Sequence, residues 1–293
     1  MKSNAKATES PLTIVEPEFE PGAADDTEGA ESRKMISAWN DHHEKKQATP
    51  KAVVAQYVAT HLVQFGQVIQ MASGTTLTAV MNKLIERQTI TKKPLELIIM
   101  TTNLDIANLA REASLVHPAI FATQQVLLTG GELHPSLLSL VGPLAAQGVM
   151  TAAINPSIVI LGAAAVSFQA DYGALIYHYG NELGTQIAYA NRPTKHRIII
   201  FDCEKLNIES GFKSTSFDQT LKTADEVSLI CNFPDTGTRE EIDRVRAEIE
   251  KFEEMLDRMK HDKSGILANK TFRLRLIDSS GNVHTEISNR PDR

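Results

Sequence analysis

Residues 68–85 constrain the fold more than any other part of the chain. They begin as an apolar run, pass through the small, hydroxyl-rich turn Ser73-Gly74-Thr75-Thr76, and continue with apolar residues at helical spacing. This order predicts a strand, a tight turn and a helix. Glycine lets the backbone approach a ligand closely, and the unpaired N–H groups at a helix start attract anions. The turn therefore indicates a phosphate site, although an ordinary helix N-cap uses the same residue types.

Predicted strands and helices alternate from residue 50 onward. We expect helices at residues 51–63, 76–88, 103–113, 142–151 and 180–190, and strands at residues 67–72, 95–100, 124–128, 156–161, 196–202 and 226–231. Several of the strands are continuous apolar runs, which is typical of strands buried on both faces. The pattern predicts an α/β fold with a mostly parallel sheet flanked by helices. Ligands of such open sheets bind at the carboxyl ends of the strands, where the Ser73–Thr76 turn is expected.

The two ends of the chain differ from this α/β domain, which we place at residues 49–236. Residues 1–48 carry ten acidic and six basic residues, three prolines and little periodic hydrophobicity, which predicts a disordered acidic segment. Residues 237–293 are expected to form a charged helix at 238–262 and a β-hairpin of strands 271–277 and 283–287. The apolar seam of this helix is expected either to pack on the domain itself or to pair with a second copy.

Composition excludes several classes of protein. A net charge of −6 and a pI near 5.9 argue against broad nucleic-acid binding. Without a signal peptide or a run of about 18 apolar residues, we expect a cytoplasmic protein that does not bind membranes. Cys203 and Cys231 lie in or near apolar runs, so they are expected to be buried and reduced. The pair His42 and His43 has no further ligands at metal-site spacing, and we expect no metal and no cofactor.

Three more predicted strand ends carry chemistry similar to that of the first turn. They are Thr102 and Asn103 after strand 95–100, Gly130 and Gly131 after strand 124–128, and Asp202 to Lys205 after strand 196–202. Each is also compatible with an ordinary cap or turn. Their joint placement at one edge of the sheet would supply the donors and the cation that a phosphorylated ligand needs.

The order and spacing of these segments resemble the C-terminal effector-sensing domain of DeoR/GlpR transcriptional regulators, from about Lys51 to Asp235. The segments that carry the resemblance are Val68–Thr76, Ile99–Ala107, Val126–Leu133, Leu140–Leu144 and Ile160–Ala163. The resemblance implies a fold shared with ribose-5-phosphate isomerase and the CoA transferases, and a pocket for a phosphorylated sugar.

The resemblance also implies roles for single residues. Ser73, Gly74, Thr75 and Thr76 would hold the phosphate, and Thr102, Asn103, Gly130 and Gly131 would line the pocket. Glu182 matches an acidic position at a helix start, and Lys205 matches a lysine after a late strand. Asp202 is open between a ligand-binding role and a strand-end cap.

Three departures from the family pattern matter for function. Residues 1–48 lack the amphipathic helices of a winged helix-turn-helix, so direct nucleic-acid binding is not expected. Ala72 stands where the family has an aspartate, and residues 163–166 are alanines and a valine instead of a glycine-rich stretch. The identity of the ligand is therefore open.

We expect a homo-oligomeric sensor in transcription regulation that binds a phosphorylated sugar or a related metabolite and lacks its own DNA-binding head. One alternative is a sugar-phosphate isomerase-like enzyme of the same fold, with Glu182 as general base and Lys205 polarising the carbonyl. Another is an interaction protein with a vestigial pocket that works through the helix at 238–262.

Overall fold

The computed structural model describes residues 50–152, 154–168, 173–177, 180–206, 212–262, 265, 267 and 269–290. All of them belong to one compact unit, residues 48–293, and residues 1–47 form a separate unit. The predicted disorder of residues 1–48 and the pair His42 and His43 lie outside the described residues. Within the described ranges, every helix is too short or too polar to span a membrane.

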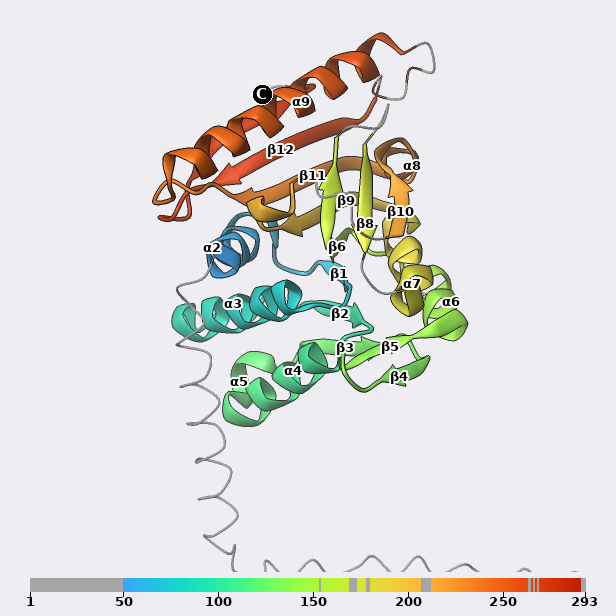
Figure 1. Ribbon diagram of the computed structural model, residues 1–293. Helices are drawn as coiled ribbons and strands as arrows, with labels where there is room; N and C mark the ends of the chain where they lie inside the picture. The colour runs from blue at the N-terminus through green and yellow to red at the C-terminus, as the bar shows by residue number, and fades with distance from the viewer. Residues whose placement is uncertain are drawn as a thin grey trace, which may run out of the picture. The chain divides into compact units, whose positions relative to one another are not determined.

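An eight-stranded sheet in the order β13-β12-β11-β9-β6-β1-β2-β3 forms the centre of this unit (Figure 1). Its strands are β1 (Val68–Met71), β2 (Ile98–Thr101), β3 (Gln125–Leu128), β6 (Ile158–Gly162), β9 (Thr194–Phe201), β11 (Ala224–Asn232), β12 (Thr271–Ile277) and β13 (Val283–Ser288). Neighbouring strands from β12 to β3 pair in parallel, and β13 runs antiparallel to β12. The α/β fold with a mostly parallel sheet is therefore confirmed.

The first described helical segments, α2 (Pro50–Tyr57) and the π-helical turn η1 (Val58–Leu62), precede β1. The other helices lie in the connections between strands and are α3 (Thr75–Thr91), α4 (Leu104–Val116), α5 (Pro118–Phe121), α6 (Gly142–Thr151), α7 (Gly180–Asn191), the 3₁₀ turn η2 (Cys203–Lys205), α8 (Phe217–Lys222) and α9 (Arg239–His261). The start of α9 shows why these residues form a helix here. Thr238 accepts a hydrogen bond from the Glu241 N–H, and the Glu241 carboxylate accepts one from the Thr238 N–H. This capping box satisfies two backbone donors at once.

The strand order changes direction between β1 and β6. From β1 the chain moves through β2 to β3 at one edge, and from β6 it moves through β9 and β11 to β12 near the other edge. Since parallel crossovers are right-handed, these two halves place their helices on opposite faces of the sheet. The carboxyl ends of β1 and β6 flank the switch point, where open α/β sheets bind ligands.

The larger core lies beneath α9 and is built around four phenylalanines. Phe168, Phe217, Phe252 and Phe272 have ring centroids 5.2 to 6.3 Å apart in successive pairs, and each is at most 1% exposed. The apolar seam of α9 packs into this cluster, from Ile242 to Met259. The seam therefore serves the packing of the domain itself, which decides between the two uses that the sequence left open.

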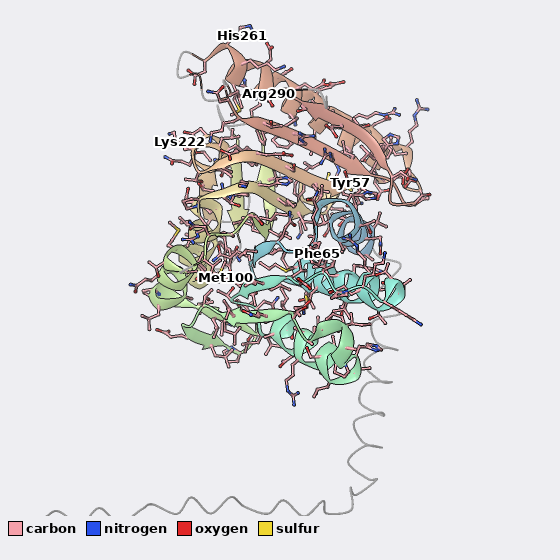
Figure 2. The ribbon with its side chains drawn as sticks, turned by 180° about the vertical axis from the view of Figure 1, so that it is seen from behind. Tyr57, Phe65, Met100, Lys222, His261 and Arg290 are labelled. Carbon is pink, nitrogen blue, oxygen red and sulfur yellow. The ribbon has the colours of Figure 1, made fainter. Side chains whose placement is uncertain are left out.

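Two groups of short strands were not predicted from the sequence. A hairpin of β4 (Glu132–His134) and β5 (Ser139–Val141) follows β3, and a small antiparallel sheet contains β7 (Ala165–Ser167), β8 (Ala174–Tyr177) and β10 (Phe212–Ser216). The predicted terminal hairpin is confirmed, but it extends the main sheet. Seen from behind, Tyr57 of α2 lies near β11 and β12 (Figure 2). The domain boundary at residues 236 and 237 stays a prediction.

Candidate functional site

The turn between β1 and α3 has the geometry of an anion site. Gly74 adopts φ +123° and ψ 152° immediately before the helix, a conformation that L side chains rarely take. Its carbonyl accepts hydrogen bonds from the N–H groups of Leu77 and Thr78 at 3.0 and 3.1 Å. The first N–H groups of a helix have no carbonyl one turn earlier, and no side chain caps this helix. Because Gly74 and Thr75 are exposed, this helix start is accessible to a negatively charged ligand.

Helix α7 contacts the residue that precedes Gly74 in this turn. Ser73 is 8% exposed, and its hydroxyl donates a hydrogen bond to Oε1 of Glu182 at 3.1 Å. The same hydroxyl oxygen accepts a hydrogen bond from Nε2 of Gln186 at 3.1 Å. Two side chains that are one turn apart on α7 therefore hold a hydroxyl at the end of β1.

Glu182 is the titratable group at the centre of this arrangement. Burial raises the pKa of the Glu182 carboxyl, while the Ser73 hydrogen bond and the nearby His134 oppose the rise. His134 lies on β4, so the unpredicted hairpin contributes an imidazole side chain to the site. A half-buried carboxyl with a raised pKa beside a histidine can exchange a proton with a bound ligand.

Several polar atoms around Glu182 are buried without a hydrogen-bond partner. They are Nδ1 of His134, Oγ1 of Thr185 and Oε1 of Gln186. Buried polar atoms in folded proteins are nearly always hydrogen-bonded to protein, water or ligand. Thr185 and Gln186 lie within about one turn of Glu182 on α7, and His134 is close enough to influence its pKa, so the unpartnered atoms belong to residues around one carboxyl. Sequence reasoning missed all three residues, because each is ordinary in its local sequence context.

Tyr189 fixes α7 to the ends of two strands. Its buried hydroxyl accepts a hydrogen bond from the Thr102 N–H at 3.1 Å and donates one to the Met71 carbonyl at 3.0 Å. The Thr102 hydroxyl oxygen is 3.2 Å from the same group. Thr102 is therefore engaged inside the protein, where it anchors α7.

Asn103 also has internal partners. Its Oδ1 accepts a hydrogen bond from the Asp105 N–H at 2.9 Å and so caps α4. Its Nδ2 donates to Oγ1 of Thr78 at 3.3 Å, and the residue is 2% exposed. Asn103 thus ties the start of α4 to the start of α3, beside the Gly74 turn.

The two glycines after β3 have different surroundings. A Cβ atom on Gly131, which has φ +121°, would lie 2.6 Å from Cβ of Ala145 and 2.8 Å from the Val141 carbonyl oxygen. Gly130, with φ +80°, has nothing within 4 Å of the same position. Gly131 therefore permits close packing at the start of α6, and Gly130 faces open space.

Asp202 and Lys205 lie at the same edge of the sheet, after β9. Nζ of Lys205 donates to the Ala163 carbonyl at 3.2 Å and is 3.8 Å from Oδ2 of Asp202, which Lys51 approaches at 4.0 Å. Burial lowers the pKa of Lys205, and Asp202 opposes this. The ends of β9 and β1 are separated by β6, so this group lies about 10 Å from the Gly74 turn.

The geometry defines a class of protein: an α/β domain with an exposed, uncapped helix start, suited to an anion, at the switch point of its sheet. Residues 46–222 match the family described as the DeoR C terminal sensor domain. The match covers more than half of the chain, and the chain belongs to this family. A comparison with curated protein sequences gives no match.

Solved structures with a similar chain path include enzymes and translation factors. Ribose 5-phosphate isomerase from Plasmodium falciparum has 19% identity and a TM-score of 0.36, covering 54% of this chain and 53% of that one. For eIF2B delta from Chaetomium thermophilum the identity is 17%, the TM-score 0.35, and the coverage 62% of this chain and 57% of that one. The chain thus spans about half the length of these proteins.

The departures at Ala72 and at residues 163–166 have clear places in the fold. Ala72 is fully buried in the large core, and its N–H donates to the Ile160 carbonyl at 3.0 Å. Ala163 and Ala165 are buried where β6 passes into β7. Both cysteines are buried and not disulfide-bonded, as predicted.

Proposed function

We propose that this chain is a cytoplasmic sensor in transcription regulation that binds a phosphorylated sugar or a related metabolite at the carboxyl edge of its sheet. The phosphate lies at the start of α3, against Gly74, Thr75 and Thr76. The sugar hydroxyls face Glu182 and the side chains around it. The observation that carries this proposal is the juxtaposition of an exposed, uncapped helix start with a buried carboxyl and unpartnered polar atoms.

The remaining predicted residues take supporting roles in this proposal. Gly130 borders the pocket, while Thr102, Asn103 and Gly131 hold the walls through their internal contacts. Asp202 and Lys205 lie about 10 Å from the phosphate, which suits the far end of a pentose or hexose. Lys205 stabilises the ends of β6 and β9 through the Ala163 carbonyl and Asp202.

A charge reversal at the phosphate site tests the proposal. Thr75→Asp places a carboxylate at the exposed first position of α3, where an acidic residue stabilises the helix by roughly 0.3 to 1 kcal/mol. The variant therefore folds, but it repels a phosphate. Thr236→Asp is the matched control, since Thr236 is exposed in the loop that follows β11, three strand positions from β1.

The assay is a thermal-shift screen of the full chain against phosphorylated pentoses and hexoses. A ligand present at one hundred times its dissociation constant stabilises the fold by about 2.7 kcal/mol. For a domain of this size that raises the melting temperature by about 5 to 10 °C. We expect this shift in the wild type and in Thr236→Asp, and no shift in Thr75→Asp. An equal shift in all three proteins would place the ligand elsewhere.

A homo-oligomer is part of the same proposal. Strand β3 is at the edge of the sheet, and its side chains Leu127 and Leu128 are 42% and 48% exposed. Exposed apolar side chains on an open sheet edge favour association with another chain. The acidic residues 1–48 support the further proposal that the chain does not read DNA by itself.

One observation favours an isomerase-like enzyme as the second candidate. The Glu182 carboxyl has a raised pKa and lies near His134, as a general base and its partner require. An isomerase would exchange a substrate hydrogen next to the carbonyl with solvent. Incubation of a bound sugar phosphate in deuterated water, followed by NMR, detects this exchange. Deuterium incorporation by the wild type that is lost in Glu182→Gln would replace the sensor by the enzyme.

A further inference from the structure

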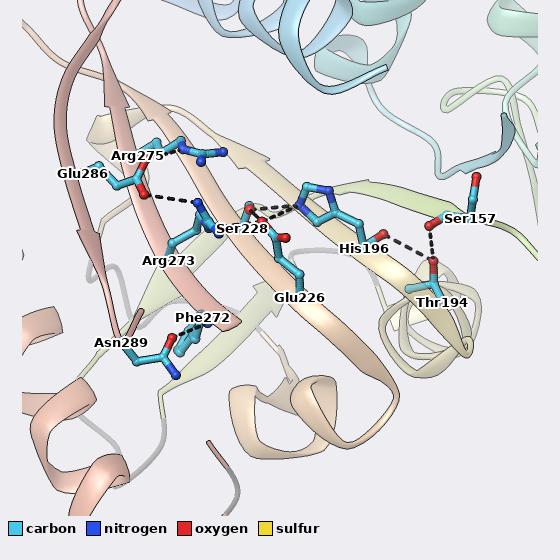
Figure 3. Close-up of polar contacts among 10 residues, drawn as sticks. All are labelled: Ser157, Thr194, His196, Glu226, Ser228, Phe272, Arg273, Arg275, Glu286 and Asn289. Atoms are coloured by element: carbon cyan, nitrogen blue, oxygen red, sulfur yellow. Dashed lines mark hydrogen bonds and ion pairs between the residues drawn. The ribbon is translucent and has the colours of Figure 1, made fainter. Parts of the chain in front are cut away.

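A cavity opens at the edge of the sheet opposite the Gly74 turn, where the strands begin. Its volume is about 360 Å³, which is within the range of roughly 300 to 1,000 Å³ that is usual for small-molecule sites. Ser157 before β6, His196 on β9 and Arg273 on β12 belong to its lining. Figure 3 shows these three side chains on neighbouring parts of the sheet. Because the strands are parallel, this edge is distinct from the carboxyl edge that carries the Gly74 turn.

The face of the sheet that lines this cavity is polar, which is unusual for a parallel sheet. In the strand register, His196 is paired with Glu226, and Ser228 with Arg273, so all four side chains point to one face. The intervening residues, such as Val227 and Phe272, point to the apolar core under α9.

Ion pairs hold this polar face together. Nε of Arg273 is 3.0 Å from Oε1 of Glu226, and its Nη1 is 3.2 Å from Oε1 of Glu286. Nε of Arg275 is 2.6 Å from the other oxygen of Glu286. Both arginines are 7% exposed. Burying such charges is costly, and well-packed apolar residues would stabilise a fold at least as well. A ligand role gives a reason to keep them.

The π-helical turn η1 closes the cavity on the side of α2. It contributes His61, whose ring packs at a tilt against that of Tyr57, with ring centroids 4.9 Å apart. Nη1 of Arg87, from α3, donates to the carbonyls of Ala59 and Val63 at 2.7 and 2.8 Å and so holds the turn in place. π-helical turns are rare and are frequent at functional sites.

The charges around the cavity favour an anionic ligand. Lys195, Arg273 and Arg275 are cationic, whereas Glu226 is the acidic residue of the lining. Glu286 pairs with both arginines, so one positive charge remains in excess over the whole cluster. Lys195 is exposed at the mouth, where its ammonium group can meet a ligand. Charge-assisted hydrogen bonds to carboxylate or phosphate oxygens are strong in such a partly enclosed place.

We propose that this cavity is a second binding site, for a small organic anion with carboxylate or phosphate groups, independent of the sugar-phosphate site. The ligand sits between η1 and the beginnings of β6, β9 and β12. Lys195 and the two arginines attract its charges. Ser157 and His196 face its remaining polar atoms.

Inorganic phosphate and citrate are the probes, with glycerol as an uncharged control. Binding to the full chain is measured by isothermal titration calorimetry, in the Thr75→Asp background so that the carboxyl-edge site is excluded. Binding of phosphate but not of citrate identifies a phosphate site. Binding of citrate but not of phosphate identifies a carboxylate site. The proposal fails if neither anion binds, or if glycerol binds as well as they do.

Two variants locate the binding. Lys195→Gln removes one exposed cation and should weaken binding about fivefold, as for a solvent-screened charge contact of roughly 1 kcal/mol. Lys213→Gln is the matched control, because Lys213 is an exposed lysine on β10. The double variant Arg275→Gln with Glu286→Gln removes one positive and one negative charge, and Arg273 keeps its ion pair with Glu226. We expect it to bind more weakly still, and binding that is unchanged in both variants would overturn the proposal.

Discussion

The adjacent glycines after β3 give the sharpest test of the local structure. Gly130→Ala puts a methyl group into open space at φ +80°, and Gly131→Ala puts one 2.6 Å from Cβ of Ala145 at φ +121°. Both substitutions strain the backbone, by roughly 1 to 3 kcal/mol. Both also reduce the conformational entropy of the unfolded chain, which stabilises the folded state by roughly 0.4 to 1 kcal/mol.

Overpacking separates the two variants. A methyl group at Gly131 collides with buried Ala145 and with the Val141 carbonyl, neither of which is the flexible end of a side chain. Such overpacking costs a further 1 to 3 kcal/mol or so. We therefore expect Gly131→Ala to lose about 2 to 5 kcal/mol and Gly130→Ala about 1 kcal/mol.

The assay is urea unfolding of the ligand-free protein, followed by circular dichroism, with the free energy of unfolding extrapolated to water. Ligand binding is measured separately on the folded variants. Equal losses for the two variants, or a loss below about 1 kcal/mol for Gly131→Ala, would refute the close packing at the start of α6. Gly131 would then be available to a ligand in the same way as Gly130.

Four other measurements test separate parts of the structure. Burial lowers the pKa of His196 from 6.5 to about 4, with Glu226 opposing and Arg273 and Arg275 adding to the shift. Because the folded-state pKa is depressed, the contribution of neutral His196 to the free energy of unfolding is complete above pH 6.5 and is lost as the pH falls towards about 4. The free energy of unfolding of His196→Gln should therefore fall less than that of the wild type over this pH range in acid-unfolding experiments. The raised pKa of Glu182 has the opposite effect, because the protonated carboxyl stabilises the fold fully below pH 4.5 and this stabilisation is lost as the pH rises. Glu182→Gln should therefore be at least as stable as the wild type near neutral pH in thermal unfolding. The full chain should give no footprint on duplex DNA at physiological salt, and a protected site with a steep salt dependence would show that it reads DNA itself. Leu128→Lys should lower the oligomer mass measured by light scattering, whereas an unchanged mass would place the interface elsewhere.

Local sequence determined most of the sheet and its helices. The strand, turn and helix at residues 68–85 follow from an apolar run, one glycine and apolar residues at helical spacing, all of which act over a few residues. The observed elements β1 and α3 confirm that prediction, and α6 and β12 begin and end where the sequence placed them. Short strands such as β4 and β7 escaped prediction because three residues carry too little periodicity.

The surroundings of the candidate site were decided by tertiary structure alone. Ser73 and Glu182 are 109 residues apart, and their hydrogen bond exists because Tyr189 fixes α7 across the strand ends. The sequence could propose Glu182 only through family resemblance, and it gave no signal for His134. Such pairings depend on the path of the whole chain.

The same distinction separates the two edges of the sheet. Backbone conformation at Gly74 depends on nearest neighbours, so the sequence revealed the carboxyl edge. The cavity at the other edge joins His61, His196 and Arg273 through strand register and a π-helical turn. Side-chain alternation along one strand specifies a face, but the neighbouring strand and its register are set only when the sheet assembles.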